Sequence, residues 1–94
     1  MVAYPLLKSN YMIAFRRGDI MQFHRLEDLR IDNDQTQAEI AEYLGCQREV
    51  YRRYEKGTRQ IPVDMLIQLS LLYNVSIDYI VGLTNEKKPY PRKI

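Results

Sequence analysis

The middle of the chain carries start and stop signals for two short helices in immediate succession. Thr36 is followed three residues later by Glu39, a capping box that predicts the beginning of a helix. Gly45 predicts the end of that helix, because glycine readily adopts the left-handed conformation in which helices commonly terminate. A second helix is expected from Gln47 to Lys56, and Gly57 stops it. These limits leave room for two helices and a tight turn between them.

Similar signals divide the rest of the chain into three further helices. A first helix is expected over residues 23–32, where Leu26 and Leu29 lie on one face. A fourth begins near Pro62, since proline suits the first turn of a helix, and a short fifth is expected over residues 76–82. No segment shows the alternation typical of a strand. The sequence therefore predicts an all-α bundle of five helices.

The composition narrows the class of protein. The chain has 94 residues, which is room for one domain, and its single cysteine excludes a scaffold held by internal disulfides. Charged residues interrupt every apolar stretch before it reaches the ~18 residues of a membrane span. The N-terminus lacks the pattern of a signal peptide. We therefore expect a small cytoplasmic protein with no membrane segment.

The residue types needed for catalysis or metal binding do not come together in the sequence. His24 is the single histidine, and no cysteine or acidic cluster lies at metal-ligand spacing from it. There is no glycine-rich phosphate loop and no nucleophile–histidine–acid set. Cys46 is expected to be a small packing group rather than a reactive thiol. We expect neither enzymatic activity nor a metal or cofactor.

The distribution of charge singles out one window of the chain. The whole chain has a net charge of +2. Residues 25–44 carry two bases and six acids, a net charge of −4, whereas residues 45–60 carry five bases and two acids, a net charge of +3. A local excess of positive charge is typical of a surface that binds a polyanion, and it is equally typical of a solvated helix face. Charge alone leaves both interpretations open.

The two central helices have the residues that a helix-turn-helix requires. Ala41 provides a small residue where the helices cross, and Gly45 provides the left-handed turn four places later. Apolar residues hold the second helix against the first: Ile40, Leu44, Cys46, Tyr51 and Tyr54. Polar residues occupy the outer face of the second helix: Arg48, Glu49, Arg52 and Arg53. Together these features predict a DNA-binding helix-turn-helix.

Over residues 25–82 the sequence resembles the Cro and phage-repressor family, also called the Xre-type family. The matching segments include Thr36-Gln37, Leu44-Gly45, YRRYEKG at residues 51–57 and NVSIDYIVG at residues 74–82. The resemblance implies a five-helix bundle like that of lambda repressor, in which the third helix enters the major groove of DNA. It also implies binding as a two-fold dimer.

The resemblance assigns roles to individual residues. It implies that four side chains of the third helix reach base edges: Gln47, Arg48, Glu49 and Arg53. It implies phosphate contacts for four others: Gln37, which also braces the third helix, Arg52, Lys56 and Arg59. Arg30 and Glu55 match an internal ion pair of the family, and we assign both to structure.

The sequence departs from the family pattern at three positions. Gln35 stands where an apolar residue is common, and Val50 stands where a polar one is common. Val50 either contacts a thymine methyl group or packs against the core. Glu49 places an acid among the expected base readers, so it either accepts a hydrogen bond from cytosine or weakens binding.

Three regions are expected along the chain: an extension at residues 1–20, the helix-turn-helix domain at 21–83 and a flexible basic tail at 84–94. Met21 begins a segment that resembles the start of the family, which leaves three explanations for the extension. It is a gene start placed too far upstream, an apolar arm that packs on the domain or a partner, or a basic arm that uses Arg16 and Arg17 in the minor groove.

We therefore expect a sequence-specific DNA-binding transcriptional regulator, a small repressor or an antitoxin-like protein. It would bind double-stranded operator DNA as a homodimer. Some apolar residues of the C-terminal half are candidates for the dimer surface or for ordinary core: Met65, Tyr73, Tyr79, Ile80 and Leu83. The alternative function is a protein-interaction module that has the same helical bundle and does not bind DNA. The sequence does not identify any further protein partner.

Overall fold

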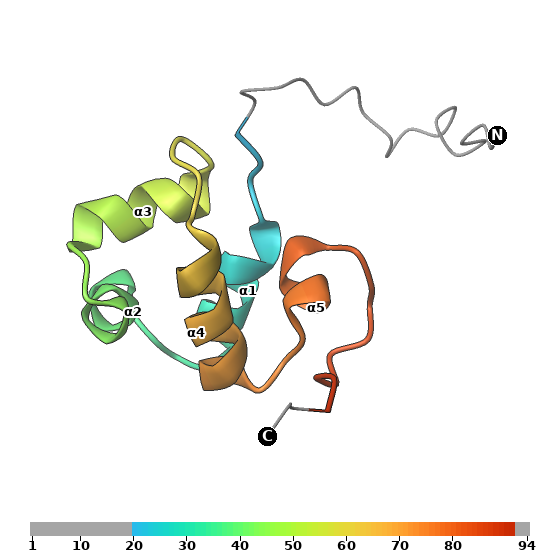
Figure 1. The fold of residues 1–94 in the computed structure, drawn as a ribbon. Coiled ribbons are helices and arrows are strands. Elements are labelled where there is room, and N and C mark those ends of the chain that lie inside the picture. Colours follow the sequence, from blue (N-terminus) through green and yellow to red (C-terminus); the bar gives the residue numbers. More distant parts are fainter. Residues whose placement is uncertain (1–19, 92–94) are drawn as a thin grey trace, which may run out of the picture.

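The computed structural model describes residues 20–91, which form a bundle of five helices with no strand among them (Figure 1). The helices are α1 His24–Asp32, α2 Gln37–Leu44, α3 Arg48–Lys56, α4 Val63–Tyr73 and α5 Ile77–Val81. The all-α, five-helix fold expected from the sequence is confirmed. No helix of residues 20–91 has the length and apolar character needed to cross a membrane.

The predicted helix boundaries follow from local chemistry. The Thr36 hydroxyl accepts a hydrogen bond from the Glu39 amide at 3.1 Å, and the Glu39 carboxylate accepts one from the Thr36 amide at 2.8 Å, so the capping box is formed. Gly45 and Gly57 end α2 and α3 at φ of +76° and +78°. Gly57 also lies so close to Gln22 that an added Cβ would be 2.6 Å from the Gln22 Cβ.

The core takes apolar side chains from all five helices and from the segments between them. Its buried members are Leu26, Leu29, Ile40, Ala41, Leu44, Tyr51, Tyr54, Ile61, Leu66, Leu69, Val75 and Ile80. Tyr51 and Tyr54 are therefore core residues, as the sequence predicts. Both come from α3, so their burial fixes one side of that helix against the rest of the domain.

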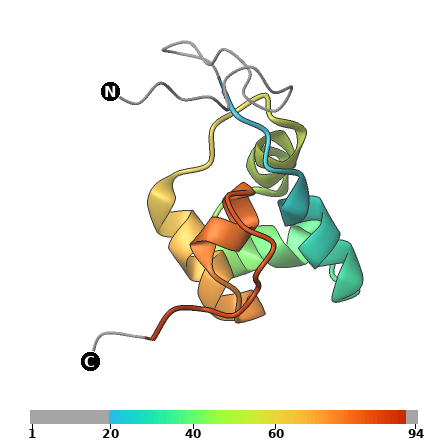
Figure 2. The same ribbon diagram turned by 90° about the vertical axis from the view of Figure 1, so that its right-hand side faces the viewer.

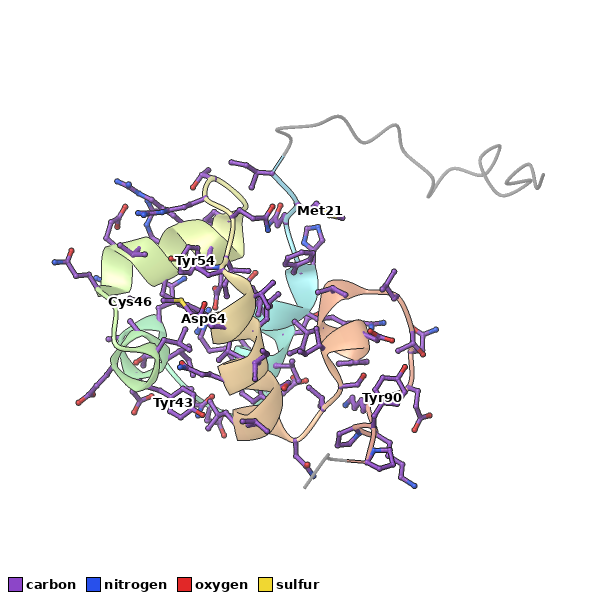
Figure 3. All side chains as sticks on the ribbon, in the orientation of Figure 1. Met21, Tyr43, Cys46, Tyr54, Asp64 and Tyr90 are labelled. Carbon is purple, nitrogen blue, oxygen red and sulfur yellow. The ribbon has the colours of Figure 1, made fainter. Side chains whose placement is uncertain are left out.

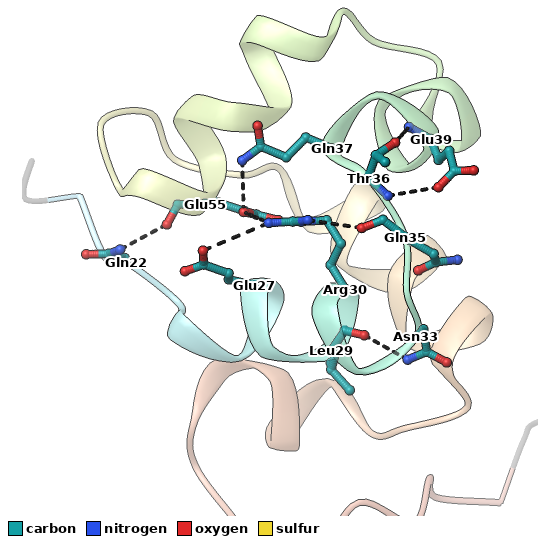
Figure 4. A network of polar contacts seen from close by, with 10 residues as sticks. All are labelled: Gln22, Glu27, Leu29, Arg30, Asn33, Gln35, Thr36, Gln37, Glu39 and Glu55. Atoms are coloured by element: carbon teal, nitrogen blue, oxygen red, sulfur yellow. Dashed lines mark hydrogen bonds and ion pairs between the residues drawn. The ribbon is translucent and has the colours of Figure 1, made fainter.

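A buried ion pair connects α1 to α3 (Figure 4). The Arg30 guanidinium lies 2.6 Å from one Glu55 carboxylate oxygen through Nε and donates to the other through Nη2 at 3.2 Å. Gln37 of α2 donates to the same carboxylate at 3.1 Å, and Arg30 also donates to the Gln35 carbonyl at 3.0 Å. Glu55 is buried, and its hydrogen bond raises the pKa of Arg30. The internal Arg30–Glu55 pair implied by the resemblance is present.

Residues 84–91, which belong to the segment expected to form a flexible tail, turn back along α1 and α5. Figure 2 shows this segment, in red, passing along α5. Arg25 of α1 donates to the Thr84 carbonyl at 2.5 Å, and the Tyr90 hydroxyl donates to the Asp78 carboxylate of α5 at 2.7 Å. Polar groups of the tail thus have hydrogen-bond partners on the helices, which composition does not reveal.

The N-terminal extension lies almost wholly outside the described residues, and so do the three explanations offered for residues 1–20. The described part begins beside the loop between α3 and α4. The Met21 amide donates to the Gln60 side chain at 2.9 Å, and the Gln22 side chain donates to the Glu55 carbonyl at 2.9 Å. The chain therefore enters α1 along the C-terminal end of α3.

We predict that Arg30→Met lowers the free energy of unfolding by about 3–5 kcal/mol, because it leaves the buried Glu55 carboxylate without its counter-charge. Thermal and urea unfolding would measure the change. The double variant R30M/E55M should recover most of the loss, since it removes both charges. The control is Glu27→Gln, which removes a half-exposed carboxylate 3.9 Å from Arg30 and should cost less than about 1 kcal/mol. A double variant no more stable than R30M would contradict the prediction.

Candidate nucleic-acid interface

Helices α2 and α3 form the helix-turn-helix predicted from the sequence. The buried Ala41 lies in α2, and its carbonyl accepts a hydrogen bond from the Cys46 amide at 2.9 Å across the turn. Cys46 is half-buried at the junction of the two helices, which Figure 3 shows, and burial raises the pKa of its thiol. The thiol is therefore a packing group in the turn, held mainly in its uncharged form.

One side of α3 packs on the domain and the other faces solvent. Tyr51, Tyr54 and Glu55 of α3 are buried, and Figure 3 shows Tyr54 on the side that faces the rest of the domain. Val50 is half-buried against the core, which favours packing over a contact with thymine. A helix held by two buried tyrosines and an ion pair presents its outer side chains from a rigid support.

The expected base-reading residues all lie on the solvent side of α3. Gln47 is the N-cap, and Arg48, Glu49 and Arg53 follow on the helix, all of them exposed. Gln47 makes no side-chain cap hydrogen bond, so its amide is available for other partners. The first turn of α3 also presents backbone N–H groups that have no hydrogen-bond partner within the helix. Such groups favour the binding of an anionic ligand at this end of α3.

The structure brings three charged residues of this face together. Arg52 donates to both oxygens of the Glu49 carboxylate, through Nε at 3.0 Å and through Nη2 at 2.7 Å. Arg53 donates to Glu49 through Nε at 3.3 Å. The hydrogen bond from Arg52, with the positive charge of both arginines, lowers the pKa of Glu49 to about 2. The sequence placed these residues on one face, but it did not indicate that they pair with each other.

The expected phosphate-binding residues occupy different environments. Gln37 is half-buried, and its side-chain nitrogen bonds to Glu55, which is the bracing contact with α3 that the resemblance implies. Arg52 is engaged by Glu49. Lys56 ends α3 and Arg59 lies in the following loop, both of them exposed. Neither forms an ion pair with another described residue.

Within residues 20–91 no group of three His, Cys, Asp or Glu side chains is placed to hold a metal ion. A cavity of about 410 Å³ lies beside α4, α5 and the tail, and no residue of α3 lines it. It is lined by Ser70, Leu71, Val75, Ser76, Ile77, Asp78, Pro89 and Tyr90. The exposed outer face of α3 is therefore the candidate functional site of the described chain.

Comparison with known proteins places the domain in a family. The family model described as helix-turn-helix matches residues 26–80, more than half of the chain. The chain is 39% identical over 69 residues to the uncharacterized HTH-type transcriptional regulator YobD of Bacillus subtilis, an alignment that covers 73% of this chain and 62% of YobD. It is 41% identical over 58 residues to the HTH-type transcriptional regulator ImmR of the same organism, covering 62% of this chain and 46% of ImmR.

Two further similarities agree with these. The cryptic phage CTXphi transcriptional repressor RstR of Vibrio cholerae is 33% identical over 58 residues, covering 62% of this chain and 52% of RstR. The chain thus spans between 46% and 62% of the lengths of these three relatives. The crystal structure of a transcriptional regulator from Listeria innocua superposes with a TM-score of 0.61 and 27% identity, covering 78% of this chain and 63% of that one.

The names of these relatives are those of transcriptional regulators and a repressor, not of enzymes. The matched residues include the whole of α2, the turn and α3. The chain belongs to the Xre-type helix-turn-helix family, the family of the Cro and phage repressors that its sequence resembles.

Proposed function

We propose that this chain is a sequence-specific DNA-binding transcriptional regulator that inserts α3 into the major groove. The observation that carries the proposal is the division of α3 into a buried face and an exposed polar face. The exposed face carries Arg48, Arg52 and Arg53 on a helix that the core holds rigidly. An α-helix fits the major groove, and arginine recognises guanine there through O6 and N7.

The roles of the remaining residues follow from their positions. Gln47, Arg48, Glu49 and Arg53 form the surface of α3 that faces base edges. Lys56 and Arg59 lie at and just beyond the C-terminal end of α3, where they would contact phosphates of the flanking backbone. Gln37 would contact a phosphate while its side-chain nitrogen braces α3 through Glu55. Binding to genomic DNA would take place in the cytoplasm, the location expected from the sequence.

The proposal includes a homodimer formed through α4. Val63, Ile67 and Leu71 recur every four residues along α4, and their side chains are 68%, 44% and 48% exposed. Asp64, in the first turn, is the only charged residue of α4, although 28% of the whole chain is charged. An apolar stripe with so few charges around it suits a second copy of itself, because two-fold pairing brings few like charges together. The residues of this stripe do not belong to the DNA-facing surface of α3.

This stripe differs from the dimer surface that the sequence suggests. Of those candidates, Ile80 is 1% exposed and belongs to the core, and Met65, Tyr73 and Tyr79 are half-buried against it. Leu83 is 77% exposed and remains a candidate for the dimer surface. Helical spacing alone does not reveal the α4 stripe, because the inward-facing and outward-facing apolar residues of α4 are interleaved in the sequence.

Selection of bound duplexes from a randomised DNA pool tests the function directly. At about 150 mM salt, weak non-specific binding is suppressed, so we expect enrichment of a two-fold symmetric motif with half-sites about 34 Å apart. Enrichment of no motif by the folded protein would contradict the proposal. It would favour the alternative function, a protein-interaction module that does not bind DNA.

We predict that Arg53→Ala weakens binding to the selected operator by about 1–3 kcal/mol and relaxes the preference at one base pair, because Arg53 reads a base. Lys56→Ala is the matched control. It should weaken binding to operator and unrelated duplexes alike and reduce the slope of log affinity against log salt by about 0.9. Fluorescence anisotropy titrations at several salt concentrations measure both effects. Equal losses on both duplexes for R53A would remove its base-reading role.

We predict that Ile67→Asp raises the dimer dissociation constant at least tenfold, about 1.4 kcal/mol, because it puts a charge into the centre of an apolar stripe. Sedimentation equilibrium measures the change. Ile31→Asp is the control, since Ile31 is 54% exposed on α1 and outside the stripe, and it should leave the dimer intact. A wild-type protein that stays monomeric at all concentrations and selects a single half-site would contradict the homodimer and point to a different partner for α4.

A further inference from the structure

The two arginines held by Glu49 are held in different ways. Arg52 uses both Nε and Nη2 on the carboxylate, at 3.0 and 2.7 Å, so the edge of its guanidinium that carries these two donors is occupied. Arg53 uses Nε alone, at 3.3 Å. Within residues 20–91, neither terminal nitrogen of Arg53 makes a hydrogen bond. One carboxylate therefore engages Arg52 in a bidentate pair and leaves the end of Arg53 open.

The open end of Arg53 is the part that recognises guanine. A guanidinium presents five N–H donors in a fixed plane, and two of them on adjacent nitrogens match guanine O6 and N7. A contact through Nε restricts the rotation of that plane and leaves both terminal nitrogens free to donate. Ordering a long side chain before binding also lowers the conformational entropy lost when it meets a base. Glu49 is thus placed to orient Arg53 without competing for the atoms that would contact DNA.

Glu49 also changes the attraction of α3 for phosphates. The outer face carries three arginines, and Glu49 reduces their combined charge from +3 to +2. With its pKa at about 2, Glu49 remains ionised at neutral pH. A phosphate that approaches Arg52 meets a guanidinium whose positive charge is already offset by a bidentate carboxylate, and it does so on every duplex regardless of sequence. This weaker attraction applies in full to non-specific binding, which gains no base contacts in return.

We propose that Glu49 is a specificity-determining positioning residue that acts through Arg53: it orients the Arg53 guanidinium towards a guanine and lowers the affinity of α3 for unrelated DNA. The proposal rests on the proposed function, because it assigns Glu49 a role within that DNA interface. In this role Glu49 acts through Arg53 and does not itself contact cytosine.

The test compares Glu49→Gln with Glu42→Gln, which removes the same charge from an exposed position on α2. Each is titrated against the selected operator, against operators substituted at each base pair, and against a scrambled duplex. For E49Q we expect binding to the scrambled duplex to be at least about threefold tighter than that of the wild type. The slope of log affinity against log salt should also be steeper. We also expect the sequence preference to fall by about threefold or more at the same base pair where R53A reduces it. E42Q should change neither quantity.

A double variant separates indirect action from direct base reading. In E49Q/R53A the base preference should equal that of R53A alone, because Glu49 has no arginine left to orient at that base pair. Loss of preference at a different base pair, persisting without Arg53, would show that Glu49 reads a base itself and would overturn the proposal. Equal effects of E49Q and E42Q would overturn it as well. If the wild-type protein selects no motif, the proposed function fails, whereas the scrambled-duplex comparison still tests the effect of Glu49 on phosphate attraction.

Discussion

The position of α3 depends on the ion pair between Arg30 and Glu55. Glu55 is buried, and a buried carboxylate is stable only when its charge and its lone pairs are satisfied. Arg30 provides the charge, Gln37 a further hydrogen bond, and the stretch before α1 attaches through the Glu55 carbonyl. Three separate parts of the chain must therefore meet at one residue of α3. An apolar contact tolerates sliding and rotation, but a bidentate pair does not, so this pair fixes the orientation of the helix.

The same nine-residue helix is at once a core element and a binding surface. Tyr51 and Tyr54 bury one side, while Arg48, Arg52 and Arg53 occupy the other. Because every outer residue is attached to a backbone that the core holds still, the positions of the arginine Cβ atoms are determined before DNA arrives. What remains variable is the direction of each long side chain. Glu49 restricts that direction for two of them, so the site is organised at the level of side chains as well as of the backbone.

Much of the fold could be predicted because its signals are local. Thr36 and Glu39 form their capping box within four residues, and Gly45 ends α2 through its own backbone conformation. The Arg30–Glu55 pair is not local, and it was expected only because the sequence resembles a family in which it occurs. The path of residues 84–91 was not expected, since the partners of Tyr90 and Thr84 lie on α5 and α1. Composition describes a polar segment, but it does not tell whether its hydrogen bonds go to water or to the protein.

The sequence by itself determined the number of helices, their limits and which residues of α3 are apolar or charged, because each depends on neighbours along the chain. The tertiary structure decided which apolar faces stay exposed and which charged groups meet. Leu69 and Leu71 are two residues apart on α4, yet Leu69 is fully buried and Leu71 is half exposed. Glu49 shares a face with two arginines by spacing alone, but the geometry of three side chains makes one pair bidentate and the other single. Burial and side-chain pairing depend on what lies opposite in space, and that is settled only when the whole chain has packed.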